Sequence, residues 1–339
     1  MRILVTGGSG YIGSHTLVSL IREGYEVLVY DNLTNSSFEV IVRVEELTGK
    51  SIRFIRGDIQ DVQRLGTLFS EEKIDAVMHF AAFKSVGESV ANPLKYYQNN
   101  VHGSLCLLQA MLAAKVNNFI YSSSATVYGE SNPSPYVETM DLGNPSSPYG
   151  ASKVMLERVL TDITKTNSSF RSVSLRYFNP IGAHHSGKIG EDPKGIPNNL
   201  LPYITQIAIG KRDKLNVFGG DYPTSDGTCV RDYLHVMDLA EGHVAALTWL
   251  KKNPAFSGSE SFNLGTGEGT SVLEIINSFE KATSLRIPYV IVDRRPGDLP
   301  SFWADPSKAH KVLGWKAKKS LHQMMIDSWC WQSKNPDGL

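Results

Sequence analysis

Short apolar runs and amphipathic stretches alternate through the first half of the chain. Residues 2–6 form an apolar run, and the stretch after it repeats apolar residues at helical spacing until Gly24. Strands that alternate with helices in this way indicate an α/β fold, a doubly wound parallel sheet of the Rossmann-like kind. The other strands of this half are predicted at residues 26–30, 52–55, 76–79, 118–122 and 172–176. Helices are predicted between the strands, at residues 38–47, 62–69 and 93–114 and from Pro148 onward.

The pattern changes after Phe178. Residues 179–199 hold several glycines and prolines and are predicted to form a loop. We therefore expect a Rossmann-like domain of residues 1–178, on which segments near 230–265 pack back, and a smaller mixed α/β lobe of residues 179–339. Ligands are expected in a crevice at the carboxyl ends of the strands. The later elements are predicted as helices at 201–209, 236–250, 272–282 and 307–313 and strands at 216–218 and 261–264.

Composition narrows the class of protein. The chain of 339 residues is 41% hydrophobic and 20% charged, as in ordinary soluble globular proteins. Its 34 basic and 34 acidic residues balance, so neither a nucleic acid nor a membrane is expected as a partner. No apolar run approaches the roughly 18–20 residues that span a bilayer, and no signal peptide is expected. The 3 cysteines are widely separated and predict neither disulfides nor a metal site, which suits the cytoplasm.

A glycine-rich turn follows the first predicted strand. Gly7, Gly10 and Gly13 give the spacing G-x-x-G-x-x-G immediately before a predicted helix. Glycine lets the backbone come close to a pyrophosphate, and a helix N-terminus attracts anions through its free N–H groups. A tight turn without a ligand is the alternative, but the strand–loop–helix context favours a dinucleotide site.

Polar residues follow the next strands. Asp31 stands where a carboxylate can accept hydrogen bonds from the ribose hydroxyls of NAD, and it would repel the 2′-phosphate of NADP. Its neighbours Asn32 and Asn35 carry no positive charge, so NAD is the expected cofactor. Asp58 is placed to reach the adenine or, equally, to cap a loop. Lys84 could bind the ribose or phosphate of the cofactor or remain a solvated lysine.

The candidate chemistry lies near the helix that is predicted to start at Pro148. Tyr149 and Lys153 are at positions i and i+4, so both project from one helix face. A nearby ammonium lowers the pKa of a phenol and makes the two a proton-transfer pair, although surface pairs at this spacing are common. Ser124 follows the preceding strand and can hydrogen-bond a substrate oxygen at the same edge of the sheet.

Several motifs together resemble one protein family. The segments TGGSGYIGSH, SSSATVYG, SPYGASK, VRDYLHVMDLA and RRPGDLPSFWAD are similar to the UDP-glucose 4-epimerase (UDP-galactose 4-epimerase) family of the extended short-chain dehydrogenases/reductases. The resemblance implies that NAD oxidises a UDP-sugar at C4 and that the hydride returns to the other face of the 4-keto sugar. Tyr149 would be the base, Lys153 would lower its pKa and hold the nicotinamide ribose, and Ser124 would bind the reacting oxygen.

The resemblance also implies two sets of binding residues, in which Tyr177 and Phe178 would wall the nicotinamide unless they are simply core residues. The implied cofactor-binding residues are Gly7, Gly10, Tyr11, Ile12, Gly13, Asp31, Asn32, Asn35, Asp58, Ile59, Phe80, Ala81, Ala82, Lys84, Asn99, Ser122, Tyr149, Lys153, Tyr177 and Phe178. The implied substrate-binding residues are Ser124, Tyr149, Asn179, Asn199, Leu200, Asn216, Val217, Phe218, Arg231, Arg295, Asp298 and Phe302.

The choice of reaction and sugar depends on a few positions. Ala125 and Thr126 stand where the related 4,6-dehydratases carry an acidic pair, so epimerisation is favoured over dehydration. Phe302 stands at the gating position, where a bulky residue resembles epimerases restricted to UDP-glucose and UDP-galactose. Alternatives are a UDP-N-acetylglucosamine/UDP-N-acetylgalactosamine 4-epimerase, a UDP-uronate 4-epimerase and a non-catalytic NAD-sensing module. The resemblance further implies galactose metabolism or surface polysaccharide synthesis, and a homodimer formed through helices 93–114 and 149–166.

Overall fold

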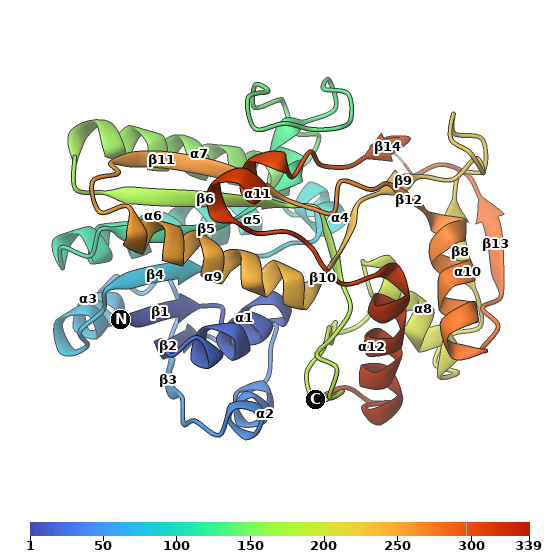
Figure 1. Cartoon of the computed structure of the whole chain (residues 1–339), viewed down its shortest axis with the longest axis horizontal. Helices are drawn as coiled ribbons and strands as arrows, with labels where there is room; N and C mark the ends of the chain where they lie inside the picture. Colours follow the sequence, from blue (N-terminus) through green and yellow to red (C-terminus); the bar gives the residue numbers. More distant parts are fainter. Residues whose placement is uncertain (296) are drawn as a thin grey trace.

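A seven-stranded parallel sheet forms the centre of the molecule (Figure 1). The structure, a computed structural model, describes residues 1–295 and 297–339. The strand order is β11-β6-β5-β4-β1-β2-β3, so the direction of winding reverses between β1 and β4, where doubly wound sheets bind ligands. This confirms the predicted doubly wound, Rossmann-like α/β class. The strands are β1 Arg2–Thr6, β2 Glu26–Asp31, β3 Arg53–Arg56, β4 Ala76–His79, β5 Asn118–Ser124, β6 Arg171–Tyr177 and β11 Gly258–Leu264.

Helices cover both faces of the sheet. Successive side chains of a strand point to opposite faces, so Ile3 and Val5 of β1 join one apolar core and Leu4 joins the other. All three side chains are fully buried. The helices over the first core are α1 Tyr11–Arg22, α2 Glu39–Thr48, α9 Val236–Lys252 and α11 Ser307–Leu313. The helices over the second core are α3 Val62–Glu71, α6 Gly103–Ala113 and α7 Pro148–Thr166.

A smaller group of elements lies beyond the carboxyl ends of the sheet strands (Figure 1). It has a core of its own, in which Ile204, Phe279 and Met325 are fully buried. Its helices are α8 Leu200–Ala208, α10 Val272–Thr283 and α12 Leu321–Lys334, beside the strand pair β8 Leu215–Phe218 and β13 Tyr289–Val292. Two further small sheets contain β7 Asn179–Ile181 with β10 Tyr233–His235, and β9 Val230–Arg231 with β12 Thr270–Ser271 and β14 Ser301–Phe302.

The prediction of one continuous α-helix over residues 93–114 is wrong. A π-helical stretch interrupts it and turns Asn99 and Asn100 inward, where both are buried. The Asn100 side chain accepts a hydrogen bond from the Phe83 amide at 2.9 Å and donates one to the Phe83 carbonyl at 2.9 Å, so the π turn holds the segment after β4. The parts are α5 Pro93–Tyr96, the π-helix Tyr97–His102 and α6 Gly103–Ala113, preceded by a short α4, Val86–Ala91.

Strand β7 and helix α12 are among the elements that the pattern did not predict. Strand β7 lies inside the predicted loop of residues 179–199 and pairs with β10 over three residues. Helix α12 carries buried polar residues on its inner side, among them Asp327 and Gln332, so its apolar periodicity is weak. Partners elsewhere in the chain satisfy these polar groups, since Asp327 lies 3.1 Å from His235 and Gln332 accepts a hydrogen bond from Thr205 at 3.0 Å.

Candidate active site

The glycine turn lies against the end of β4. Gly7 has a φ of +70°, and a Cβ there would stand 2.6 Å from the amide nitrogen of Ala81. A Cβ on Gly13 would collide with the carbonyl oxygen of Gly7, because the first turn of α1 packs closely on the loop. Gly10 is the N-cap of α1 and offers no side-chain cap. The first N–H groups of α1 are therefore available to a bound anion.

The carboxylate of Asp31 lies buried at the end of β2. Its Oδ2 accepts a hydrogen bond from the amide of Ser9 at 3.0 Å, and its Oδ1 accepts one from the amide of Leu33 at 2.9 Å. Asp31 is thereby fixed beside the glycine turn. Asn32 donates to Oδ2 of Asp58 at 2.8 Å, which joins the ends of β2 and β3. These contacts form a polar rim along one side of the turn.

The other side of the turn carries a charged pair that the sequence did not reveal. Nζ of Lys84 lies 2.6 Å from Oε1 of Glu191, and the side-chain Nδ2 of Asn199 donates to the same oxygen at 2.6 Å. A candidate cofactor residue and a candidate substrate residue therefore meet at one carboxylate. The hydroxyl of Tyr11 donates to the carbonyl of Gly182 at 2.6 Å, which ties α1 to the same segment.

The tyrosine and lysine lie at the start of α7. Ser147 caps the helix by accepting a hydrogen bond from the amide of Gly150 at 3.2 Å, and Pro148 occupies the first turn. Lys153 lies one turn beyond Tyr149 and is buried, with Nζ donating to the Ser122 carbonyl at 2.6 Å. The same Nζ is 5.7 Å from the centre of the Tyr149 ring. Both side chains therefore face the carboxyl end of β5.

Burial acts on both members of this pair. Desolvation raises the pKa of Tyr149, and the hydroxyl of Ser124 opposes the rise. Desolvation also lowers the pKa of Lys153 to about 7, against the influence of Glu157. A lysine that titrates near neutral pH, beside a phenol, suits proton transfer.

Ser124 ends β5 at this edge. Its Oγ accepts hydrogen bonds from the amide and the hydroxyl of Thr126, at 3.2 and 3.0 Å, and so caps the 3-10 turn Ala125–Tyr128. In the sheet it is paired with Tyr177 at the end of β6. The hydroxyl of Tyr177 lies 3.3 Å from Nε2 of His243 on α9. The ends of β5 and β6 thus place Ser124 beside Tyr177. The Ser124 hydroxyl also lies close enough to Tyr149 to act on its pKa.

A second cluster gathers the candidate substrate residues. Asp298 accepts hydrogen bonds from Arg295 at 2.8 and 3.1 Å and lies 3.5 Å from Arg231. The guanidinium of Arg295 also lies 5.6 Å from the centre of the exposed Phe218 ring. The side chain of Val217 is buried in the core, so this candidate can meet a ligand only through its backbone.

Phe302 lies between this second cluster and the strand ends that carry the candidate catalytic groups. It lies on β14 opposite Arg231 of β9. Its ring centre is 4.6 Å from that of Tyr136 and 5.2 Å from that of Phe178, which follows β6. The same apolar cluster includes Ala125, next to Ser124. The candidate gate therefore packs against the segments that carry the candidate catalytic groups.

The remaining candidates differ in their exposure. Ile59 is buried in the core under α6, whereas Asn35 is exposed. Asn99 donates to the neighbouring Asn100 at 2.9 Å, and the amide of Asn179 donates to the carbonyl of Asp232 at 2.9 Å. The other candidates lie on or just after elements of the candidate site: Ile12 and Leu200 in the first turns of α1 and α8, Phe80 and Ala82 after β4, Ser122 on β5 and Asn216 on β8.

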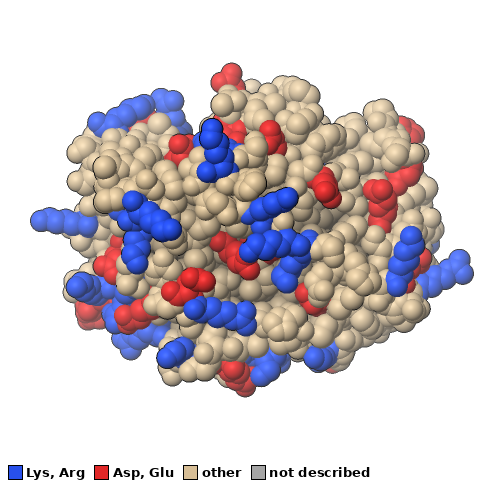
Figure 2. Space-filling model, viewed as in Figure 1, with Lys and Arg blue, Asp and Glu red and all other residues tan. Residues whose placement is uncertain are grey.

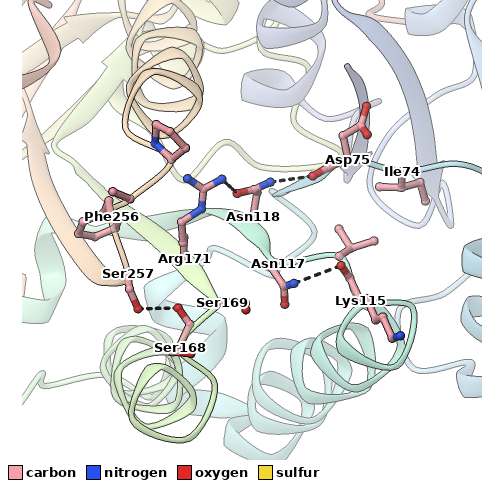
Figure 3. A pocket seen from close by; sticks show the side chains of 13 residues that line it. Ile74, Asp75, Lys115, Asn117, Asn118, Ser168, Ser169, Arg171, Phe256 and Ser257 are labelled. Carbon is pink, nitrogen blue, oxygen red and sulfur yellow. Dashed lines mark hydrogen bonds between the residues drawn. The ribbon is translucent and has the colours of Figure 1, made fainter.

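One hollow of the surface lies elsewhere (Figure 3). It has a volume of about 500 Å³ and is lined by residues from the amino ends of β5 and β6 and the segment before β11. Arg171 is engaged there by the carbonyls of Leu250 and Asn253, at 3.0 and 3.1 Å, and by Asn118. These contacts secure the end of α9, so the arginine has a structural role at the edge of the sheet opposite to the candidate site.

Figure 2 shows acidic and basic side chains interspersed over the face in view. In residues 1–295 and 297–339, no helix is long and apolar enough to cross a membrane. Within the same ranges, no three histidine, cysteine or acidic side chains gather as a metal site.

Comparisons with known proteins agree with this geometry. The family model described as GDP-mannose 4,6 dehydratase matches residues 4–327. The curated UDP-glucose 4-epimerase of Erwinia amylovora is 56% identical over all of this chain and 99% of its own length. The crystal structure of UDP-glucose-4-epimerase from Stenotrophomonas maltophila, with bound NAD and formylated UDP-arabinopyranose, has a TM-score of 0.96 at 48% identity, with 99% of each chain covered. That of UDP-glucose 4-epimerase from Bifidobacterium longum, in complex with NAD+ and UDP, has a TM-score of 0.95 at 48% identity, with 100% of each chain covered.

The doubly wound sheet, the glycine turn and the Tyr149–Lys153 pair define an extended short-chain dehydrogenase/reductase. Within that class the chain belongs to the UDP-glucose 4-epimerase family, because its curated relatives match it along nearly their whole length. The resemblance stated from the motifs is thereby confirmed.

Proposed function

We propose that the chain is an NAD-dependent isomerase that interconverts UDP-glucose and UDP-galactose by epimerisation at C4. The observation that carries the proposal is the buried Lys153 beside Tyr149, at the strand end that bears Ser124. A module that merely sensed NAD would have no use for a phenol and an ammonium at this place. The relatives named as UDP-glucose 4-epimerases support the same reaction.

The residues around the glycine turn fit NAD. A Cβ on Gly7 or Gly13 would collide with protein backbone, so both glycines are needed for the tight turn, and the uncapped start of α1 attracts anions. Asp31 offers its carboxylate to the adenosine ribose, and the buried hydroxyl of Ser9 has no partner among the described residues. Lys153 is placed for the nicotinamide ribose. When bound, NAD supplies the acceptor that takes the hydride from C4 of the sugar and gives it back.

The chain's own residues handle the proton. Tyr149, as the phenolate, accepts the proton of the C4 hydroxyl and later returns it to the oxygen of the 4-keto sugar. The ammonium of Lys153 stabilises the phenolate, and Ser124 hydrogen-bonds the reacting oxygen. Because the sugar turns over before the hydride returns, the product is the C4 epimer and no net oxidation occurs. Neither Ala125 nor Thr126 could act as the acid or base of a dehydration.

The second cluster is assigned to the UDP group. Arg231 and Arg295 would bind the diphosphate, and Asp298 would accept from the uridine ribose. In the structure the three side chains already lie together. Phe302 would close the sugar site against N-acetyl groups. The further substrate contacts assigned here are Asn179, Asn199, Leu200, Asn216, the Val217 backbone and Phe218.

The division of labour follows the predicted domains. Residues 1–178, with segments near 230–265, would hold NAD, and residues 179–339 would hold the UDP-sugar. The position of β11 in the main sheet supports this division. We assign the activity to the cytoplasm and to galactose metabolism. Cys106, Cys229 and Cys330 are free thiols, as expected in a reducing compartment.

A homodimer is part of the proposal. Apolar side chains stand exposed on neighbouring helices, with Leu94 81% exposed, Val90 61% and Met155 45%. They lie on α5, α4 and α7, and α7 packs against both of the shorter helices. A second copy would cover this surface in a helix bundle. Light scattering should therefore give twice the chain mass, and Leu94→Glu should give the monomer; a wild-type monomer at micromolar concentration would contradict the dimer.

A panel of sugar nucleotides tests the function. The purified protein should convert UDP-galactose to UDP-glucose and the reverse, and it should release NAD when denatured. UDP-N-acetylglucosamine, UDP-N-acetylgalactosamine and UDP-glucuronate should react far more slowly. Turnover of an N-acetylated or uronic sugar at the rate of UDP-glucose would replace the proposed substrate, and failure with every sugar in the panel would overturn the enzyme assignment.

A further inference from the structure

A buried ion pair lies directly behind the candidate catalytic helix. Glu157 stands one turn after Lys153 on α7, so the two side chains share a helix face. Its carboxylate accepts hydrogen bonds from Nη2 of Arg176 at 2.6 Å and from the hydroxyl of Ser123 at 2.5 Å. The two charged side chains are only 7% and 6% exposed.

The pair belongs to a larger hydrogen-bonded chain. Nη1 of Arg176 donates to the Tyr128 hydroxyl at 3.1 Å, and that hydroxyl donates to Asn263 at 2.6 Å. Asn263 in turn donates to the carbonyl of Tyr136 at 2.8 Å. The contacts join α7, β5, β6 and β11 just beneath the end of the sheet. Glu157 is thereby held by partners on two neighbouring strands, β5 and β6.

Stability does not explain such a pair. A buried salt bridge loses hydration on both partners, and apolar residues of similar volume often stabilise a fold equally well. The same helix face continues into the core with Leu156 and Leu160 nearby, which shows that apolar side chains fit this layer. The charges at Glu157 and Arg176 therefore call for a reason beyond packing.

We propose that Glu157 is a positioning residue of this active site, which holds Lys153 in the ammonium form and anchors the strand end that carries Ser124. The proposal rests on the proposed function of the Tyr149–Lys153 pair. The anchor is the hydrogen bond from Ser123, the residue next to Ser124. The electrostatic effect acts over one turn of α7: the carboxylate of Glu157 favours the ammonium form of Lys153, which in turn stabilises the Tyr149 phenolate.

The electrostatic surroundings of Lys153 support this role. Burial drives the pKa of Lys153 down to about 7, and the charge of Glu157 is the influence that raises it. Burial and the charge of Lys153 lower the pKa of His79 to about 3, so His79 is neutral. The titratable groups that face Lys153 or its partners are Tyr149 and Glu157 on α7, Tyr121 on β5, His79 on β4, and Arg176 and Tyr177 on β6.

Among these described groups, Glu157 supplies the carboxylate, which is paired with Arg176. Burial raises the pKa of Tyr121 and of Tyr177 well above the ordinary value, so both stay neutral. Without the carboxylate, Lys153 would lose its proton at lower pH. A neutral amine does not stabilise the phenolate, and the base would be lost with it.

Two variants at one position separate charge from packing. Glu157→Gln keeps the size of the side chain and removes its charge, whereas Glu157→Asp shortens the side chain and keeps the charge. The alkaline limb of the kcat profile should move to lower pH in Glu157→Gln and stay near the wild-type position in Glu157→Asp. Each unit of that shift lowers the protonated fraction of Lys153 about tenfold above its pKa. A merely structural role would lower kcat at every pH and leave the midpoint unmoved.

Folding is controlled separately. Glu157→Gln leaves Arg176 buried without its anion, which can unfold the protein. The double variant Glu157→Gln/Arg176→Gln removes both charges and carries the same test, with an expected shift in the same direction. Ser123→Ala removes one hydrogen bond of the anchor but no charge, and it should lower kcat without moving the pH midpoint. If Glu157→Gln and the double variant both had the pH midpoint of the wild-type protein, the electrostatic role would be overturned.

A readout without turnover completes the experiment. In protein labelled with [ε-13C]lysine, the Lys153 signal, assigned by its loss in Lys153→Met, should titrate at lower pH in Glu157→Gln than in wild type. An unchanged titration would overturn the inference even if activity had changed. Wild-type protein that fails to epimerise UDP-galactose would overturn the proposed function instead, so the two failures are distinguishable.

Discussion

Tyr149 acquires its chemistry from its neighbours. Burial alone raises the pKa of the phenol and would make it a worse base. The hydroxyl of Ser124 opposes this rise. In the proposed mechanism the ammonium of Lys153, held on the Ser122 carbonyl at 2.6 Å, and the positive nicotinamide would lower the pKa further. The proposed base therefore depends on a protonated Lys153 and on the bound cofactor.

Replacing the phenol isolates this role. Tyr149→Phe removes the hydroxyl and keeps the ring, so the fold and the NAD content should remain. The loss of general-base catalysis should lower kcat by about 10²–10⁴-fold. Steady-state assays with UDP-galactose and NAD quantification after denaturation measure the two properties. Tyr289→Phe, at an exposed position on β13, serves as the control and should be fully active; residual activity of Tyr149→Phe near wild type would refute the assignment.

The gate can be tested at the same scale. Phe302 is half-buried against Tyr136 and Phe178, so Phe302→Ala should open space beside the sugar and lower stability by less than the roughly 3–5 kcal/mol of a fully buried Phe→Ala change. The ratio of kcat/KM for UDP-N-acetylglucosamine to that for UDP-glucose should rise. Phe302→Tyr keeps the bulk and should leave the ratio unchanged. A ratio unaffected by Phe302→Ala would show that another residue selects the sugar.

At the scale of elements, the loop from β1 to α1 depends on glycines, because they have no Cβ. Gly13 packs where a Cβ would meet the carbonyl of Gly7 and lie 2.8 Å from Cα of Gly8. Both contacts are with backbone atoms, which cannot swing away as a flexible side chain would. The close approach fixes the direction in which the first turn of α1 points, and with it the direction of the free N–H groups.

A matched pair of glycine variants tests the loop. Gly13→Ala should displace the turn, so the protein should be purified with less NAD and should unfold at lower temperature. Gly66→Ala is the control, because Gly66 is exposed in α3 and an added methyl group there would meet no described atom within 4 Å outside its own helix. That control should raise the free energy of unfolding by about 0.5–1 kcal/mol. Equal NAD content in both variants would contradict the role of the turn.

The elements also show what the sequence could predict. The turn, the first strands and the Tyr149–Lys153 face were predictable because each depends on spacing within a few residues. The roles of Asn100 and Glu191 were not, since each arises from contacts with residues far away in the chain. Glu157 did carry a local signal, its i+4 spacing from Lys153, but its buried partner Arg176 lies on strand β6, distant in the chain.

At the scale of the whole molecule, buried histidines link stability to pH. His15 and His79 have their pKa lowered to about 3, and His184 and His243 to about 4, chiefly because burial disfavours the charged ring. In the unfolded chain each would titrate near 6.5. The unfolded state therefore binds more protons between these values, and the stability that the neutral rings contribute is present above about pH 6.5 and is lost as the pH falls.

Urea unfolding at several pH values measures this loss. The free energy of unfolding should be highest above about pH 6.5 and should decrease at pH 6.0 and again at pH 5.5. Each histidine contributes up to about 1.4 kcal/mol per pH unit once its unfolded form is fully protonated. Glu138 and Asp232, whose pKa burial raises, offset part of the decrease. His243→Asn removes one titrating ring beside Tyr177, so the free energy of unfolding should decrease less steeply with falling pH, by up to about 1.4 kcal/mol per pH unit. A free energy of unfolding that stays flat from pH 7.5 to 5.5 would mean that these rings are protonated in the folded protein.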